Sequence, residues 1–554
     1  MKPAGGFGYN STGSVTGPRG LDEKFGRMLA SISRKVEFLG KWKVSLLTTI
    51  AIVTIVIGAR SYYSLVTGYI VPDEAYYYNI LILDGELIPG YRPVFVAIFV
   101  LFFHGVRSVW TFLLIGALYS TIWAYGCILL FFMILRRLKV PERISSLLLL
   151  SLPLFPIFTV FTAAILTETL GLFLALLGVY FGLRHMQKGR LADSLLSLVF
   201  FLLAYSVREA YLIFALGNGV LFLALSIKRR SFTSLIVYMI LISMLFLPVP
   251  VRLNPIEFAQ PIHAAFGWMP RLVSGLVSCG AWSNSTRCSP TRLVEAVTIG
   301  LGYGFNPLFA LFAVFSVLAL VIDVFRGRSS IGLFLALNMV WSFGAFIVST
   351  AVVLTAFGSG ALSGWTSSII RGTHPLMPSV VGFPNLLRRL KTKRVAGLII
   401  ILVILGSTQL GSLASAFQRS LSLEPVDRIS LDYRAPYYKM YLLAKDSGNV
   451  LIFGGLHWRG IRMYMAMLPN VVLVRSGISA TEFRALLERD WDSVFLYDDW
   501  YTIEIPSMIN AYPKFYAEIL RSRQYPGYSV ETLWIDGESY ALRMIKNNAS
   551  SGSP

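Results

Sequence analysis

Two adjacent carboxylates, Asp73 and Glu74, follow the first strongly apolar run of the chain, in the stretch GYIVPDEAYYYN at residues 68–79. A carboxylate can act as a general base that removes a proton from a hydroxyl nucleophile. Ionisable groups at the ends of membrane helices are costly to place and are usually either paired or functional. The pair is therefore a candidate catalytic site, and a solvated loop pair without a role is the alternative interpretation.

Further ionisable residues lie near the ends of later apolar runs: Glu168 in LTETL, Arg208 and Glu209 in SVREAY, and Arg371 and His374 in IIRGTHPLMP. Arginine can hold a phosphate with paired donors. A carboxylate base beside such cations suits group transfer from a phosphate-linked donor. Structural roles are the alternative: Arg208 could pair with Glu168 or with Glu209. Arg371 could mark a membrane boundary, and His374 could be structural.

Membrane helices are needed to position these residues. Hydrophobic residues make up 55% of the 554 positions, charged residues 14%, and the mean hydropathy is +0.65, which excludes an ordinary soluble protein. The apolar runs are continuous rather than alternating, so a helical protein is expected instead of a membrane barrel. With about 20 apolar residues per crossing, the sequence predicts about eleven crossings. They lie at 44–60, 108–135, 144–160, 163–183, 192–206, 210–227, 232–250, 303–325, 330–355, 373–388 and 396–416.

The net charge of +20 reports topology rather than a nucleic-acid partner. Basic clusters such as RRLKVPER and RRLKTKR fall at alternate ends of the proposed crossings, as in membrane proteins that keep Lys and Arg cytoplasmic. This pattern predicts a multi-pass protein of the cell (plasma or inner) membrane with a cytoplasmic amino terminus. The loops at 61–107, 251–302 and 356–372 are then extracytoplasmic. The segment 91–106 is expected to lie along or dip into the outer interface.

Three domains are expected: a disordered cytoplasmic tail at 1–41, a transmembrane domain at 42–417, and an extracytoplasmic α/β domain at 418–554. In the last domain, the short apolar runs NVLIFGGL and VVLVRSG are bounded by glycine and are predicted strands. The segment SVETLWIDGESYALRMI near its end is predicted to form a hairpin. Its GG does not complete a dinucleotide fingerprint.

The three cysteines form no CxxC pair and no metal-ligand cluster. Cys127, inside a predicted crossing, is interpreted as a packing residue. Cys279 and Cys288 share one loop, where a disulfide is an open alternative.

The order of these motifs resembles the glycosyltransferase C superfamily. After the carboxylate pair come DGELIPGYRPVF, a segment ending in FFHG, TETLGLFLALLGVYF, REAYLIF and RGTHPLMP. Within the superfamily the chain most resembles the branch that uses polyprenyl-phosphate sugars, such as protein mannosyltransferases and the aminoarabinose transferases of lipid A. The resemblance covers about 44–416. Where many relatives carry Arg or Lys shortly after the acid pair, this chain has AYYY.

The resemblance implies a role for each candidate residue. Asp73 would be the general base, Glu74 would support it, and Arg371 would lie near the lipid phosphate. The remaining candidates are assigned to binding of the substrate and its phosphate: Arg208, Glu168, Glu209, His374, Tyr77 and Arg92. No cofactor or metal is obligatory if these cations stabilise the leaving phosphate; a divalent metal is possible but not indicated.

The predicted function is inverting transfer of one sugar from an undecaprenyl- or dolichyl-phosphate donor to an extracytoplasmic lipid, glycan or protein acceptor. A transporter or flippase is the alternative, but coupling residues near the bilayer midplane and paired halves would be expected there. An oligosaccharyltransferase ranks lower, because the first loop has DE instead of DxD and YDDW at 497–500 poorly replaces a WWDYG-like element. A scaffold would not need charges converging from several segments.

Overall fold

The computed structural model describes most of the membrane helices and most of the C-terminal domain. The described residues are 19–68, 72–84, 92–155, 165, 167–228, 230–246, 290–299, 307–325, 330–357, 373–384, 435–454, 459–475, 477–498, 513–535 and 540–547. The expected crossing at 396–416, Arg371, and the two loop cysteines Cys279 and Cys288 lie outside them.

Among the residues that the structure describes, four helices are long and apolar enough to cross a membrane. They are the Lys43–Thr67 part of α1 (Arg19–Thr67), α4 (Val109–Arg137), α6 (Thr167–Lys188), and the Ile331–Ala351 part of α13 (Ser330–Phe357). Each overlaps an expected crossing. A continuous apolar run of this length forms a helix in lipid, because only a helix pairs all of its backbone N–H and C=O groups within the run. The protein is therefore built as a multi-pass membrane protein.

Shorter helices occupy most of the other expected crossings: α5 (Glu142–Ser151), α7 (Leu191–Val207), α8 (Leu212–Lys228), α9 (Phe232–Phe246) and α12 (Pro307–Phe325). The number of eleven crossings stays a prediction. α3 (Pro93–Phe103) has 11 residues, too few for the roughly 20 of a crossing. α1 begins at Arg19, within the segment assigned from sequence to a tail.

The expected crossing at 373–388 begins differently from the prediction. Residues His374–Gly382 form a fully buried 3₁₀-helix, η6, instead of an α-helix. Pro378, which lies inside the helix, disfavours an α-helix here, because proline has no backbone N–H to donate and its ring clashes with the preceding helical turn.

Close helix packing in the bundle depends on glycine and on buried amides. In α6, a Cβ added at Gly178 would lie 2.8 Å from the Phe201 ring of α7, so only glycine allows this approach. Asn218 of α8 and Asn338 of α13 are buried and exchange two side-chain hydrogen bonds of 3.1 Å. Cys127 is buried in α4 as a free cysteine, as expected for a packing residue.

The C-terminal domain contains a mixed six-stranded sheet. Its order is β2 (Val471–Arg475), β1 (Val450–Gly454), β3 (Ser493–Asp498), β6 (Tyr540–Lys546), β5 (Tyr528–Ile535) and β4 (Gln524–Tyr525). β1 pairs in parallel with β2 and β3, whereas β5 and β6 form the antiparallel hairpin that the sequence predicts. The helices of the domain within the described residues are α18 (Pro436–Lys445), α19 (Arg459–Met465), α20 (Ala480–Leu487) and α22 (Lys514–Ser522). The small α/β domain is therefore present.

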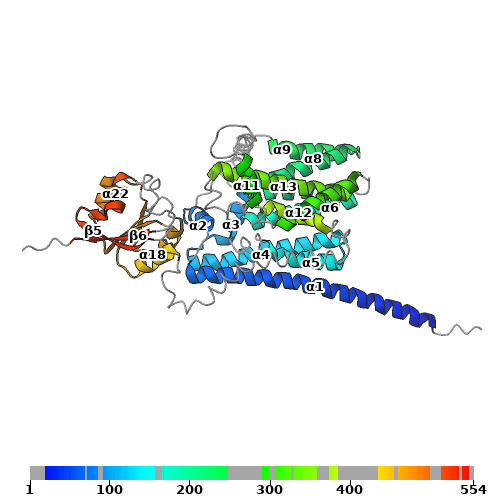
Figure 1. Cartoon of the computed structure of the whole chain (residues 1–554), viewed down its shortest axis with the longest axis horizontal. Coiled ribbons are helices and arrows are strands. Elements are labelled where there is room, and N and C mark those ends of the chain that lie inside the picture. The colour runs from blue at the N-terminus through cyan, green and yellow to red at the C-terminus, as the bar shows by residue number, and fades with distance from the viewer. Residues whose placement is uncertain are drawn as a thin grey trace, which may run out of the picture.

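The C-terminal domain lies at one end of the helix bundle, beside α2 (Pro72–Tyr78), and the amino-terminal part of α1 projects from the other end (Figure 1). The short helices α2, η1 (Asn79–Leu83) and α3 lie at the end that faces the domain (Figure 1). These short helices carry the carboxylate pair and its surroundings.

Candidate functional site

The carboxylate pair lies in α2, which follows the end of α1. Asp73 is a helical residue whose side chain is outside the described part of the structure. The Glu74 side chain is buried, with 5% exposure, and its Oε1 accepts a hydrogen bond of 2.6 Å from the backbone N–H of Ile165. Glu74 therefore ties α2 to the chain just before α6.

Arg92 is the cap residue at the start of α3 and is held in an uncommon backbone conformation. Its φ of 45° lies in the left-handed region, which costs a non-glycine residue about 1–3 kcal/mol and is concentrated at functional sites. Its Nη1 donates to the Tyr77 hydroxyl at 2.9 Å and to Thr167 Oγ1 at 3.4 Å. The Tyr77 ring is fixed by Phe95 and Phe99 of α3. Arg92 thus links α2 to the start of α6.

Arg208 reaches the same point from the turn between α7 and η4 (Glu209–Tyr211). Its Nη1 donates to Thr167 Oγ1 at 3.4 Å, and its Nη2 lies 3.4 Å from Oε1 of Glu168. Glu168 has no exposed surface, and its Oε2 accepts from the Thr167 hydroxyl at 3.2 Å. A buried carboxylate therefore orients Arg208.

The two arginines meet at Thr167, a residue that the sequence analysis missed. Thr167 is the first residue of α6, where unsatisfied N–H groups and the helix dipole favour a negative charge. Two guanidinium groups next to a helix amino terminus form an arrangement suited to an anion, phosphate in particular. The motif LTETL contained Thr167, but nothing in its neighbourhood along the chain indicated that two distant arginines would reach it.

His374 lies behind this cluster. It is fully buried in η6, and its ring packs edge-on against Tyr211 at 5.2 Å between centroids. The Tyr211 ring in turn fills the space over Gly171, where an added Cβ would lie 2.9 Å from it. The Glu209 side chain is outside the described part, as is the whole of Arg371. Of the residues predicted from sequence, the structure brings together Glu74, Tyr77, Arg92, Glu168, Arg208 and His374.

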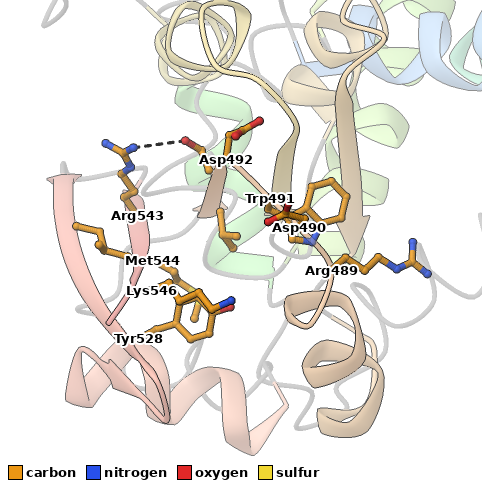
Figure 2. Close-up of a pocket in the computed structure, with 11 residues that line it drawn as sticks. Arg489, Asp490, Trp491, Asp492, Tyr528, Arg543, Met544 and Lys546 are labelled. Atoms are coloured by element: carbon orange, nitrogen blue, oxygen red, sulfur yellow. Dashed lines mark hydrogen bonds between the residues drawn. The ribbon is translucent and has the colours of Figure 1, made fainter. Parts of the chain in front are cut away.

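A metal site is not seen among the described residues, where no three His, Cys, Asp or Glu side chains are grouped to hold an ion. A polar hollow of about 290 Å³ lies in the C-terminal domain, at the start of β3 and the end of β6 (Figure 2). Arg489, Asp490, Asp492, Arg543 and Lys546 are among its lining residues. Because β1 and β3 are parallel, this hollow lies at the opposite end of the sheet from α19, which follows β1.

Comparison with known proteins gives structural neighbours only. No protein-family model matches the sequence, and no curated protein matches it. ArnT from Cupriavidus metallidurans in the apo state has a TM-score of 0.45 and 12% identity, over 95% of this chain and 100% of that one. The same protein bound to undecaprenyl phosphate gives 0.45 and 12%, over 94% and 99%.

Another neighbour is the oligosaccharyltransferase of Archaeoglobus fulgidus. Its structure tethered to an acceptor peptide has a TM-score of 0.44 and 12% identity, over 91% of this chain and 74% of that one. At this level of similarity, the roles of individual residues have to be inferred from this chain alone.

Proposed function

We propose that the protein is a membrane glycosyltransferase that moves one sugar from a polyprenyl-phosphate donor to an extracytoplasmic lipid, glycan or protein acceptor. The observation that carries this proposal is the convergence of Arg92 and Arg208 on the hydroxyl of Thr167 at the amino terminus of α6. The carboxylate-bearing helix α2 is joined to the same place through Glu74 and Ile165.

The phosphate of the donor binds between the two arginines. Both contacts to Thr167 are 3.4 Å long, whereas a favourable N–H···O hydrogen bond is about 2.7–3.2 Å. A phosphate oxygen at this point would give each guanidinium a shorter, charge-assisted bond. The Glu168 carboxylate lies 3.4 Å from Arg208 and orients its guanidinium toward this point.

Asp73 acts as the base in the transfer step. It takes a proton from the acceptor hydroxyl or amine as that group attacks the anomeric carbon. The bond between this carbon and the phosphate oxygen breaks, and the lipid phosphate leaves with the electron pair. Attack opposite the leaving group inverts the anomeric configuration. The arginines and the helix amino terminus stabilise the charge that develops on the phosphate, so a metal ion is not obligatory.

Lipid retention tests the phosphate site. We expect polyprenyl phosphates to co-purify with the wild-type protein and to be identified by mass spectrometry. Arg92→Lys and Arg208→Lys keep the charge but lose the paired donors. Losing a charge-assisted bond of about 1.5–3 kcal/mol lowers retention roughly 10- to 100-fold. Arg107→Lys, at an exposed position between α3 and α4, is the matched control and should retain the lipid. Equal retention by all three variants would exclude this phosphate site.

Transfer itself is measured in proteoliposomes with a radiolabelled polyprenyl-phosphate sugar and a membrane extract as the acceptor source. Appearance of label in the acceptor fraction supports a transferase. Movement of the labelled lipid between leaflets without sugar transfer would instead favour a flippase.

A further inference from the structure

One short helix of the C-terminal domain binds both ends of the segment that carries the carboxylate pair. Arg462 and Tyr464 lie two positions apart on α19. The Arg462 guanidinium makes a two-pronged ion pair with Asp84, with Nη1 donating to Oδ2 at 2.7 Å and Nη2 to Oδ1. The Tyr464 hydroxyl donates to the carbonyl oxygen of Gly68 at 2.8 Å. The segment between these two points, Gly68–Asp84, contains α2 and η1.

The contact at Gly68 requires glycine. Its φ of +70° is in the left-handed region, and an added Cβ would lie 2.5 Å from the Tyr438 ring of α18. Next to it, the backbone N–H of Ala435 donates to the carbonyl oxygen of Thr67 at 2.9 Å. The C-terminal domain thus closes directly on the junction between α1 and the carboxylate-bearing segment.

An aromatic cluster fixes α19 against the membrane domain. The Tyr464 ring lies within 6.0 Å, centroid to centroid, of each of its neighbours: Tyr437, Tyr438, Tyr441 and, from α4, Trp110. Burial, reinforced by Tyr438 and Tyr441, raises the pKa of Tyr464 well above its ordinary value. The hydroxyl therefore stays protonated and remains a donor to Gly68.

The middle of the segment is fixed from the opposite side. Glu74 accepts from Ile165, and the Tyr78 hydroxyl donates to the carbonyl oxygen of Val106 at 2.9 Å. The membrane domain therefore holds α2 at its centre, and α19 holds the two ends. The two ends of the segment, Gly68 and Asp84, are thus held by contacts with the C-terminal domain as well as by their covalent connection to the membrane domain.

We propose that Arg462 and Tyr464 are positioning residues, through which the C-terminal domain sets the place of Asp73 relative to the phosphate site. This inference rests on the proposed function, since it concerns the geometry of the same transfer step. A misplacement of about 1 Å can lower a rate about 10²-fold. The domain thus acts on turnover through α2.

The proposal is tested by swapping the charges of Arg462 and Asp84. Both side chains are only partly buried, with 33% and 25% of them exposed, so each position can accept the opposite charge. Arg462→Asp and Asp84→Arg alone should each lower the turnover number by about 10²-fold. Retention of polyprenyl phosphate should stay unchanged. The double variant should recover most of the turnover, because it restores an ion pair. Arg484→Asp, at an exposed position of α20 in the same domain, should behave as the wild type.

Backbone hydrogen exchange of residues 68–84 gives a readout that does not depend on activity. Exchange should rise in both single variants, return toward the wild-type level in the double variant, and stay unchanged in Arg484→Asp. Unchanged exchange in the single variants would overturn the proposal, as would full turnover or a double variant without recovery. If the wild-type protein transfers no sugar, the proposed function fails, and the exchange pattern alone decides whether α19 holds the segment. Tyr464→Phe, which removes only the hydroxyl, should raise exchange near Gly68.

Discussion

Arg92 and Arg208 both donate to one hydroxyl, that of Thr167, with each Nη1 at 3.4 Å from its oxygen. The two side chains come from segments far apart in the sequence. Both reach Thr167 at the start of α6. A substitution at Thr167 can therefore either block the proposed phosphate site or leave it accessible.

Thr167→Asp should block the site by placing a carboxylate between the two guanidinium groups. The expected result is loss of co-purified polyprenyl phosphate, because the new carboxylate pairs with the guanidinium groups in place of the phosphate. The thermal unfolding temperature should fall, because the new charge lies beside the buried Glu168 carboxylate, which also loses the Thr167 hydroxyl as a donor. Thr167→Val removes the hydroxyl at nearly constant size and should retain the lipid. Equal lipid retention by the aspartate and valine variants would contradict the prediction. Mass spectrometry of the bound lipid and a thermal melt in detergent measure the two effects.

Asp73→Asn should abolish the proton transfer while keeping the size of the side chain. We expect sugar transfer to fall by about 10²–10⁴-fold, the usual effect of losing a general base. Lipid retention should persist, since the arginines are untouched. Asp446→Asn, at an exposed position after α18, is the control for a generic loss of charge. A folded Asp73→Asn protein that transfers sugar at the wild-type rate would show that Asp73 is not the base.

Glu74 should affect stability and position more than proton transfer, because its carboxylate accepts the Ile165 N–H in a buried place. Glu74→Gln keeps an acceptor oxygen and should lower transfer less than Asp73→Asn does. Glu74→Ala leaves the buried N–H without that acceptor, which costs about 1–3 kcal/mol of unfolding free energy. Thermal unfolding of the two variants side by side measures this difference. Similar unfolding temperatures for both would mean that the hydrogen bond to Ile165 contributes little.

Much of the membrane architecture could be predicted because a long apolar run has only one common solution in lipid. The ends of α4 and α6 lie close to the expected limits for this reason. The 3₁₀-helix at His374–Gly382 was missed, although Pro378 in the sequence disfavours an α-helix there.

The polar side chains of the candidate site could be predicted, because burying such groups in a membrane protein is costly and usually functional. Which of them contact one another could not be predicted. Arg208 meets both Glu168 and Thr167, and which partner lies nearest depends on the packing of α6 against α7. The ion pair between Arg462 and Asp84 joins residues 378 positions apart, and no local pattern marks either one. Contacts of this kind become visible only when the C-terminal domain is placed against α2.

Gly68→Ala should separate the C-terminal domain from the carboxylate-bearing segment. The new methyl group would lie 2.5 Å from the Tyr438 ring, so the ring or the backbone has to move. The left-handed backbone adds a cost of about 1–2 kcal/mol. Gly105→Ala is a matched control, because Gly105 also has a positive φ, of +77°, but an added Cβ meets nothing within 4 Å. Gly105→Ala therefore introduces the same backbone strain without a steric clash.

The two glycine variants therefore isolate the contact with Tyr438. Gly68→Ala should lower the unfolding temperature more than Gly105→Ala, and it alone should raise hydrogen exchange at 68–84 and reduce sugar transfer. Matching losses of stability, with unchanged exchange at 68–84, would mean that Tyr438 adapts to the methyl group and that docking at Gly68 does not depend on glycine. Thermal unfolding and exchange mass spectrometry on both variants decide between these outcomes, because the backbone strain is common to both and cancels in the comparison.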